Sequence, residues 1–197
     1  MKELLKKVTE GQNLTREEAA KAMDMMLEGT ASPVLVSAFL TALRMKGETV
    51  DEIVGCTEMM KSKGGSVKLD TDEYIDFVGT GGDGANSFNI STTSMFVCAA
   101  AGVTVAKHGN RAASSKSGAS DLLEALGANI MLEPKQVEQC INETGMGFMN
   151  AMKFHKAMKN VGPIRKQIGI RTIFNMLGPL SNPSNASRQV IGVFSPE

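Results

Sequence analysis

The stretch that decides the fold reads Ile75-Asp76-Phe77-Val78-Gly79-Thr80-Gly81-Gly82-Asp83-Gly84-Ala85-Asn86-Ser87-Phe88-Asn89-Ile90-Ser91-Thr92. Residues 75–78 are typical of a short strand, and glycine fills four of the six positions from 79 to 84. Glycine lets a backbone turn tightly and approach a ligand closely. Amides in such a turn can form an anion-binding nest, to which the following helix adds its positive dipole end. Taken alone, the turn also fits a purely structural role, and it matches neither standard nucleotide-binding fingerprint.

A second loop of the same kind follows a predicted strand at residues 103–106. It reads Lys107-His108-Gly109-Asn110-Arg111-Ala112-Ala113-Ser114-Ser115-Lys116-Ser117-Gly118 and carries three cations in twelve residues. In a protein without net charge, this local basicity favours a small, multiply anionic ligand over a polymer, although a solvated basic loop is the alternative. Ligands of open α/β sheets bind at the carboxyl ends of the strands, where both loops are expected. Together, the loops indicate a substrate that carries a diphosphate.

The remaining pattern from residue 67 onward alternates strands with helices. Further strands are predicted at 129–131, 146–149 and 189–194, and helices at 92–101, 119–126 and 134–143. Such alternation predicts an α/β domain with a mostly parallel sheet. The last predicted strand runs almost to Glu197, and few strands precede it. We therefore expect the α/β domain at 67–197 to be incomplete.

The first 66 residues read as a small helical domain, with helices from about 163–182 as candidates to join it. Thr15 with Glu18, and Thr49 with Glu52, fit the capping box, and Ser32-Pro33 fits a helix start. An apolar helix face is predicted behind that start, at Leu35, Ala38, Phe39, Ala42 and Leu43. This face either closes the core or forms a dimer interface.

Bulk composition excludes several classes of protein. Lysine and arginine number 21, as do aspartate and glutamate, so no basic excess points to nucleic acid. No stretch approaches the roughly 20 apolar residues that span a bilayer, and the charged start at Met1–Lys7 is unlike a secretory signal. Three widely spaced cysteines and two histidines argue against a disulfide framework and a structural zinc site. These features predict a cytoplasmic protein that does not bind a membrane.

Three segments resemble anthranilate phosphoribosyltransferases closely, and the similarity extends through the whole chain. They are residues 79–92, residues 107–127 and Arg171-Thr172-Ile173-Phe174-Asn175-Met176-Leu177-Gly178-Pro179-Leu180-Ser181-Asn182-Pro183. The resemblance implies transfer of 5-phosphoribosyl from phosphoribosyl diphosphate to the amine of anthranilate, a step of tryptophan biosynthesis. It also implies Mg²⁺ as cofactor and a homodimer formed through the helical domain.

The family motifs assign binding residues but no covalent catalyst, so positioning and electrostatics are expected to carry the reaction. For anthranilate, the resemblance implies Gly79, His108, Asn110 and Arg165, whose guanidinium would hold the carboxylate in a fork, and Ser91 would contact Mg²⁺. The phosphoribosyl diphosphate site would comprise Gly79, Gly82, Asp83, Ser87, Asn89, Ile90, Ser91, Thr92, Lys107, His108, Gly109, Asn110, Arg111, Ala112, Ala113, Ser114, Ser115 and Ala119.

The chain departs from the family pattern at two places that bear on activity. The family reads Ser-Gly-Ser-Ala-Asp where this chain has Ser117-Gly118-Ala119-Ser120-Asp121, so a hydroxyl moves by one residue, about a third of a helical turn. In addition, the acidic Asp-Glu pair that holds a second Mg²⁺ in the family lies beyond Glu197. We therefore expect this chain to be an N-terminal portion that does not turn over alone.

Two other functions are weighed against the transferase. A pyrimidine nucleoside phosphorylase of the same fold has a similar glycine-rich loop but a distinct lysine-serine signature in place of residues 107–111. A non-catalytic relative that binds nucleic acid would need a basic surface stripe, which zero net charge disfavours.

Overall fold

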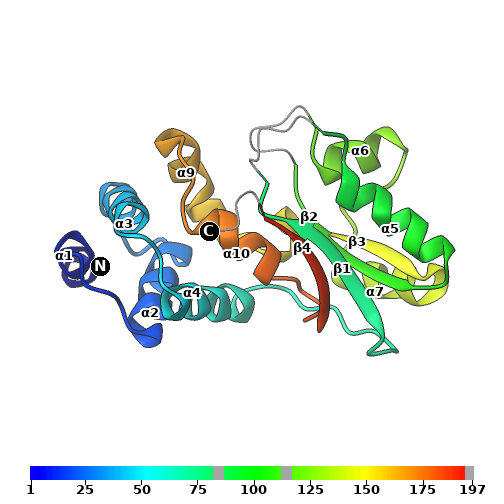
Figure 1. Cartoon of the computed structure of the whole chain (residues 1–197), viewed down its shortest axis with the longest axis horizontal. Coiled ribbons are helices and arrows are strands. Elements are labelled where there is room, and N and C mark those ends of the chain that lie inside the picture. Colours follow the sequence, from blue (N-terminus) through cyan, green and yellow to red (C-terminus); the bar gives the residue numbers. More distant parts are fainter. Residues whose placement is uncertain (82–86, 112–116, 194–197) are drawn as a thin grey trace. The chain divides into compact units, whose positions relative to one another are not determined.

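The computed structural model describes residues 1–81, 87–111 and 117–193 (Figure 1). The chain divides into two compact units, each built from two segments of sequence. The helical unit comprises Met1–Gly64 and His155–Ser181, and the α/β unit comprises Gly65–Phe154 and Asn182–Glu197.

Four helices and their caps form the first segment of the helical unit. They are α1 (Lys2–Thr9), α2 (Arg16–Leu27), α3 (Pro33–Lys46) and α4 (Val50–Ser62). Both predicted capping boxes are confirmed, because the threonine accepts from the amide of the glutamate and the glutamate side chain accepts from the threonine amide. The second segment adds a 3₁₀ helix, η1 (Lys156–Asn160), and the helices α9 (Gly162–Ile168) and α10 (Phe174–Leu180).

The core of the helical unit corrects the predicted apolar face of α3. Phe39 and Leu43 are buried as expected, but the other buried positions are Val36 and Leu40, while Ala38 is exposed. Leu35 and Ala42 are only partly buried. Apolar residues nearly encircle α3, so sequence alone does not define the centre of its buried stripe. Packing against α1 and α9 decides it.

Helices α2 and α4 pack with almost no space between their backbones. A Cβ atom placed on Gly55 of α4 would lie 2.1 Å from the carbonyl oxygen of Arg16. One residue further on, the Cys56 thiol donates to the Ala19 carbonyl at 3.6 Å. Glycine is therefore required at position 55 for this close approach.

The α/β unit is built on a parallel sheet in the order β3-β2-β1-β4, which confirms the predicted fold class. Its strands are β1 (Tyr74–Gly79), β2 (Thr104–Gly109), β3 (Met146–Asn150) and β4 (Arg188–Gly192). Its helices are α5 (Ile90–Ala100), α6 (Ala119–Ala125), α7 (Pro134–Thr144) and α8 (Ala151–Phe154).

The strand predicted at 129–131 is wrong, because these residues form a turn that leads into α7. The side chain of Asn129 accepts a hydrogen bond from the Met131 amide at 3.0 Å, which closes the turn locally. Ile130 is buried although it belongs to no strand.

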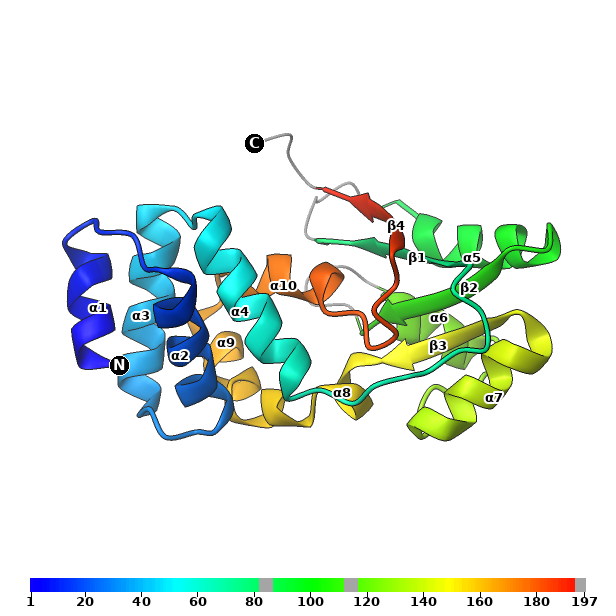
Figure 2. The same ribbon diagram turned by 90° about the horizontal axis from the view of Figure 1, so that it is seen from below.

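Helices cover both faces of the sheet (Figure 2). Consecutive residues of β2 show this, since Val105 packs in a cluster with Met95 of α5 and Ala106 packs in another with Val137 of α7. Strand β1 has β2 on one side and β4 on the other. The carboxyl end of β1 therefore lies where the strand order reverses, the position at which such sheets bind ligands.

Candidate functional site

The predicted site residues of the α/β unit that the structure describes lie at or next to the carboxyl ends of β1 and β2. Gly79 ends β1 and pairs with Gly192 of β4, while Gly109 ends β2 and pairs with Asn150 of β3. Of the other predicted residues, Asn110 and Arg111 directly follow β2, and the rest lie at the starts of α5 and α6 or just before α5: Ser87, Asn89, Ile90, Ser91, Thr92 and Ala119. Gly82, Asp83, Ala112, Ala113, Ser114 and Ser115 lie outside the described residues.

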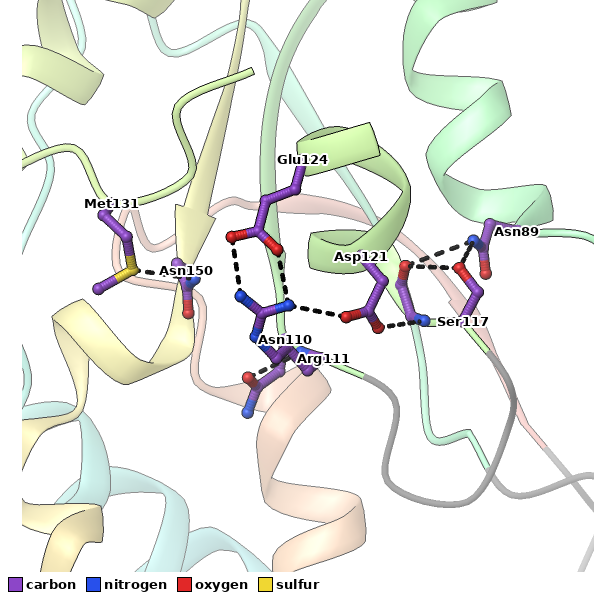
Figure 3. Close-up of polar contacts among 9 residues, drawn as sticks. Asn89, Asn110, Arg111, Ser117, Asp121, Glu124, Met131 and Asn150 are labelled. Atoms are coloured by element: carbon purple, nitrogen blue, oxygen red, sulfur yellow. Dashed lines mark hydrogen bonds and ion pairs between the residues drawn. The ribbon is translucent and has the colours of Figure 1, made fainter. Parts of the chain in front are cut away.

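Asn89 joins the two strand-to-helix connections directly. Its side-chain amide donates to the Ser117 hydroxyl at 3.1 Å and to the Gly118 carbonyl at 3.3 Å (Figure 3). Asn89 comes immediately before α5, and Ser117 and Gly118 come immediately before α6. Two helix starts that are far apart in sequence are thus held side by side.

The side chains at the start of α5 differ in their exposure. Thr92 is buried, Ser91 is partly buried, and Ile90 is exposed. The hydroxyl of Ser91 is therefore a side-chain oxygen at this helix start that remains accessible to a ligand, whereas Ile90 would contribute its backbone.

Arg111 is already paired with carboxylates of α6. Its guanidinium donates to Asp121 Oδ1 and to Glu124 Oε1, both at 2.8 Å (Figure 3). Hydrogen bonds to Glu124 and then Asp121 raise the pKa of Arg111. Asp121 also accepts from the Gly118 amide at 2.8 Å, so one carboxylate contacts both Arg111 and Gly118.

Lys107 is a buried cation near the end of β2, with 3% of its surface exposed. Its ammonium donates to the Phe77 carbonyl, which is its hydrogen-bond partner among the described residues. Burial lowers the pKa of Lys107 to about 8, against the opposing attraction of Asp76. An ammonium has three donors, so this one retains hydrogen-bonding capacity for an anionic ligand.

The structure separates the roles of positions 119 and 120. Ala119 faces β2, since its Cβ lies 3.2 Å from where a Cβ on Gly109 would be. Ser120 is fully buried, and its hydroxyl has no hydrogen-bond partner in the part of the chain that the structure describes. Position 119 therefore presents a methyl group to β2, and the hydroxyl of the neighbouring Ser120 is enclosed in the α/β unit.

Arg165, one of the four residues predicted to bind anthranilate, lies on α9 of the helical unit. Its guanidinium is 5.0 Å from the centre of the Phe174 ring, and burial lowers its pKa. No carboxylate among the described residues pairs with it. His155, in contrast, is a buried packing residue whose Nε2 lies 3.0 Å from the Ser181 carbonyl oxygen.

Sequence reasoning missed a buried polar cluster beneath the loops. Asp76 of β1 is fully buried, and it contacts the His108 amide and the side chain of Gln189. Asn182 is also buried and donates to the Ala106 carbonyl at 3.0 Å. The available signal was a charged residue inside the apolar run Ile75-Asp76-Phe77-Val78.

A parallel sheet with two joined polar turns at its carboxyl edge, in a chain that also carries a helical unit, defines an α/β protein of the class that binds ligands at its strand ends. Residues 2–64 match the helical bundle domain of a glycosyl transferase family, and residues 71–197 match the a/b domain. The chain belongs to this glycosyl transferase family.

Curated relatives are similar over the whole chain. An anthranilate phosphoribosyltransferase of Acetivibrio thermocellus is 56% identical over 196 residues, which cover 100% of this chain and 57% of the relative. That of Nitrobacter hamburgensis is also 56% identical, over 99% of this chain and 58% of the relative. The chain thus spans less than two thirds of the length of these proteins.

Solved structures agree with this result. The anthranilate phosphoribosyltransferase of Thermus thermophilus has a TM-score of 0.92 and 46% identity over 98% of this chain and 59% of its own. The enzyme of Saccharomyces cerevisiae in complex with PRPP and Mg has a TM-score of 0.85 and 32% identity, over 93% of this chain and 55% of its own.

A membrane span requires a helix of sufficient length and hydropathy. Within the described residues, no helix meets both requirements.

Proposed function

We propose that the whole protein transfers the 5-phosphoribosyl group of phosphoribosyl diphosphate to the amine of anthranilate. The observation that carries this proposal is the contact of Asn89 with Ser117 and Gly118, which holds two polar strand-to-helix turns together at one sheet edge. A substrate with phosphates at both ends of a ribose needs anion sites of this kind close to one another. The similarity to curated anthranilate phosphoribosyltransferases supports the same substrates.

The phosphates are proposed to bind the backbone amides at the start of α5 and the ammonium of Lys107. Helix α5 has eleven residues, and the amides of its first turn have no carbonyl partner within the helix. Its dipole adds partial positive charge at the same place. Lys107 supplies a full charge in a setting where little water screens it.

In the reaction, the amine nitrogen of anthranilate forms a bond to the anomeric carbon of the ribose while the bond from that carbon to the diphosphate oxygen breaks. Pyrophosphate leaves with the electron pair, and the amine releases a proton to solvent. Negative charge grows on the leaving group, so a fixed cation such as Lys107 stabilises the transition state more than the substrate. An aromatic amine is uncharged at neutral pH, which makes a strong general base unnecessary.

Mg²⁺ fits the described residues as an ion held chiefly by the substrate. No group of three His, Cys, Asp or Glu side chains suited to a metal occurs among them, but Ser91 offers a partly buried hydroxyl at the start of α5. Mg²⁺ commonly binds substrate phosphates and waters with few protein ligands. When bound there, the ion would neutralise charge on the diphosphate.

For anthranilate, we propose that Arg165 binds the carboxylate. Its guanidinium has no carboxylate partner among the described residues and is held over the Phe174 ring. A planar guanidinium can bind a carboxylate through two parallel hydrogen bonds. Gly79, His108 and Asn110 are proposed to contact the same substrate.

We further propose that the protein forms a homodimer and that it is located in the cytoplasm. Large apolar side chains are exposed on α3 and α4, where Val34, Met45 and Val50 each have more than 70% of their surface accessible. The three cysteines are free, which suits a reducing compartment. Light scattering coupled to gel filtration would measure the mass of the assembly.

The first experiment follows the loss of anthranilate fluorescence after phosphoribosyl diphosphate and Mg²⁺ are added to the full-length gene product. We expect a decay that requires both additions. A flat trace from folded protein would count against the transferase and leave the phosphorylase and the binding protein to be tested. Product formed from thymidine and phosphate would favour the phosphorylase.

A further inference from the structure

The inference begins with a gap in the sheet. Among the described residues, the ladder between β1 and β2 is limited to the pairs Tyr74–Thr104 and Ile75–Val105. The outer ladders continue to the strand ends, since β1 and β4 pair as far as Gly79–Gly192 and β2 and β3 as far as Gly109–Asn150. The two central strands therefore lack backbone pairing along the residues that lead into the substrate loops.

Two side chains cross this gap in place of the ladder. The carboxylate of Asp76 on β1 accepts a hydrogen bond from the His108 amide of β2 at 3.1 Å. In the opposite direction, the ammonium of Lys107 on β2 donates to the Phe77 carbonyl of β1. The carboxyl ends of the two strands are thus held by one acidic and one basic side chain. Asn182 adds a third link, because it donates to the Ala106 carbonyl of β2 and hydrogen-bonds Asp76 of β1.

Asp76 is itself fixed from several sides. It is fully buried, and its Oδ2 accepts from the side-chain amide of Gln189 on β4 at 3.2 Å. Burial raises the pKa of Asp76, while hydrogen bonds from Asn182, the His108 amide and Gln189 and the charge of Lys107 oppose that rise. A carboxylate with this many donors has a defined position, and it links three strands of the sheet.

We propose that Asp76 is a positioning residue of the phosphoribosyl diphosphate site, which replaces the missing ladder between β1 and β2 and so fixes Lys107 and His108. The inference rests on the proposed function, because it assumes that Lys107 binds phosphate. Asp76 is not a catalytic residue, since it acts through the neighbouring strand.

Asp76 is also the charged group that acts on the ammonium of Lys107. Of the other elements that pack against β2, strand β3 has no titratable side chain, and the titratable residue of α5 is Cys98. On α7, Glu138 accepts from the Lys68 amide and Glu143 accepts from Gln139. The attraction of Asp76 opposes the lowering of the Lys107 pKa by burial, so removing this carboxylate lowers that pKa further.

The test uses the full-length gene product and compares Asp76→Asn with Val137→Ala by calorimetric titration with inorganic pyrophosphate across the pH range around 8. Asn keeps the size of Asp76 and one acceptor but removes its charge. We expect binding to weaken on the order of tenfold near neutral pH. We also expect the loss of binding at alkaline pH to move to lower pH, because Lys107 then deprotonates earlier. Val137 of α7 lies in the core cluster that also contains Ala106, so its truncation controls for lost stability alone.

Each outcome decides a different claim. Wild-type protein that does not bind pyrophosphate at any pH overturns the proposed function. Wild-type binding with an unchanged affinity and pH profile in Asp76→Asn overturns the positioning role. An equal weakening in Val137→Ala, with no shift of the pH profile in either variant, also overturns it, because it shows a purely structural effect.

A milder variant covers the case in which Asp76→Asn does not fold. Gln189→Leu removes one donor from the Asp76 carboxylate on a partly exposed strand. We expect a smaller loss of pyrophosphate affinity in this variant. Unchanged affinity in folded Gln189→Leu protein would count against the positioning role of Asp76.

Discussion

The guanidinium of Arg111 lies between the carboxylates of Asp121 and Glu124, with one nitrogen 2.8 Å from Asp121 Oδ1 and another 2.8 Å from Glu124 Oε1. The cation that the sequence assigns to phosphate is therefore already neutralised by carboxylates of α6. An anionic ligand that recruits Arg111 has to compete with these two side chains.

Removing one competitor should strengthen ligand binding. The pair is about half exposed, with 48% of the Arg111 side chain and 41% of the Glu124 side chain accessible, so it contributes little stability. We expect Glu124→Gln to tighten pyrophosphate binding about threefold, measured by calorimetric titration. Glu143→Gln on α7 makes the same change in net charge and should leave the affinity unchanged. Equal affinity in wild type and Glu124→Gln would show that Arg111 does not take part.

The buried hydroxyl of Ser120 should reduce stability. It has no hydrogen-bond partner within the described ranges of the chain, so its desolvation is not compensated there. We expect Ser120→Ala to raise the free energy of unfolding by about 1 kcal/mol in urea denaturation. Ser184→Ala is the contrasting control, because its hydroxyl donates to Asn182 at 2.7 Å. That variant should lose stability, and a loss in both would contradict the argument for Ser120.

Arg165 should determine the affinity for anthranilate. A lysine keeps the charge but cannot form two parallel hydrogen bonds with a carboxylate or stack flat on the Phe174 ring. In the fluorescence assay with the full-length gene product, we expect Arg165→Lys to raise the KM for anthranilate about tenfold and to leave that for phosphoribosyl diphosphate nearly unchanged. Lys166→Ala, on the exposed neighbour, should behave as wild type. A rise in the KM for phosphoribosyl diphosphate alone would move Arg165 to the other substrate.

Glu52 should make the stability of the helical unit depend on pH. Burial acts to raise its pKa, but hydrogen bonds from the amides of Leu14 and Thr49 and from Lys46 lower the pKa overall. The pKa of Glu52 is thus lower in the folded state than in the unfolded state. Its contribution to the free energy of unfolding is therefore fully present above the unfolded pKa and is lost as the pH falls through the folded pKa. We expect Glu52→Gln to cost about 3 kcal/mol at pH 7, because it leaves the buried Lys46 without its counter-charge.

The measurement is urea unfolding at a series of pH values. The difference between wild type and Glu52→Gln should shrink as pH falls below about 4, near the ordinary glutamate pKa. Glu58→Gln removes an exposed partner of Arg16 and should cost little at any pH. A difference between wild type and Glu52→Gln that stays constant down to about pH 3, well below the ordinary glutamate pKa, would exclude the charge as the cause.

Local signals in the sequence predicted much of this fold. Capping boxes depend on residues three positions apart, so Thr15 with Glu18 and Thr49 with Glu52 were identified correctly. The buried face of α3 depends on which helices pack against it, so Val36 and Leu40 were missed. Asn129-Ile130-Met131 has the apolar character of a strand but is short, and the Asn129 side chain closes a turn instead.

For the candidate site, too, features set by neighbouring residues were predictable from the sequence, and features set by packing were not. Its loops were predicted because glycines and cations stand close together in the sequence. The partners of those residues were not, since Asp76 and Gln189 are 113 positions apart and meet only in the folded sheet. The pairing of Arg111 with Glu124 spans 13 positions and depends on how α6 is oriented.

The composition of the helical unit from two segments has a consequence for synthesis. Val161, Ile164, Phe174 and Leu177 belong to the same core as Phe39 and Leu43, yet they follow the segment Gly65–Phe154 in the chain. On the ribosome, α1 to α4 emerge long before these residues. Until then, the apolar side chains of α1 to α4 that pack against the second segment stay exposed to solvent. Closing such a long loop costs entropy and slows folding. Cooperative completion of the helical unit is therefore expected only after residue 181 has left the exit tunnel.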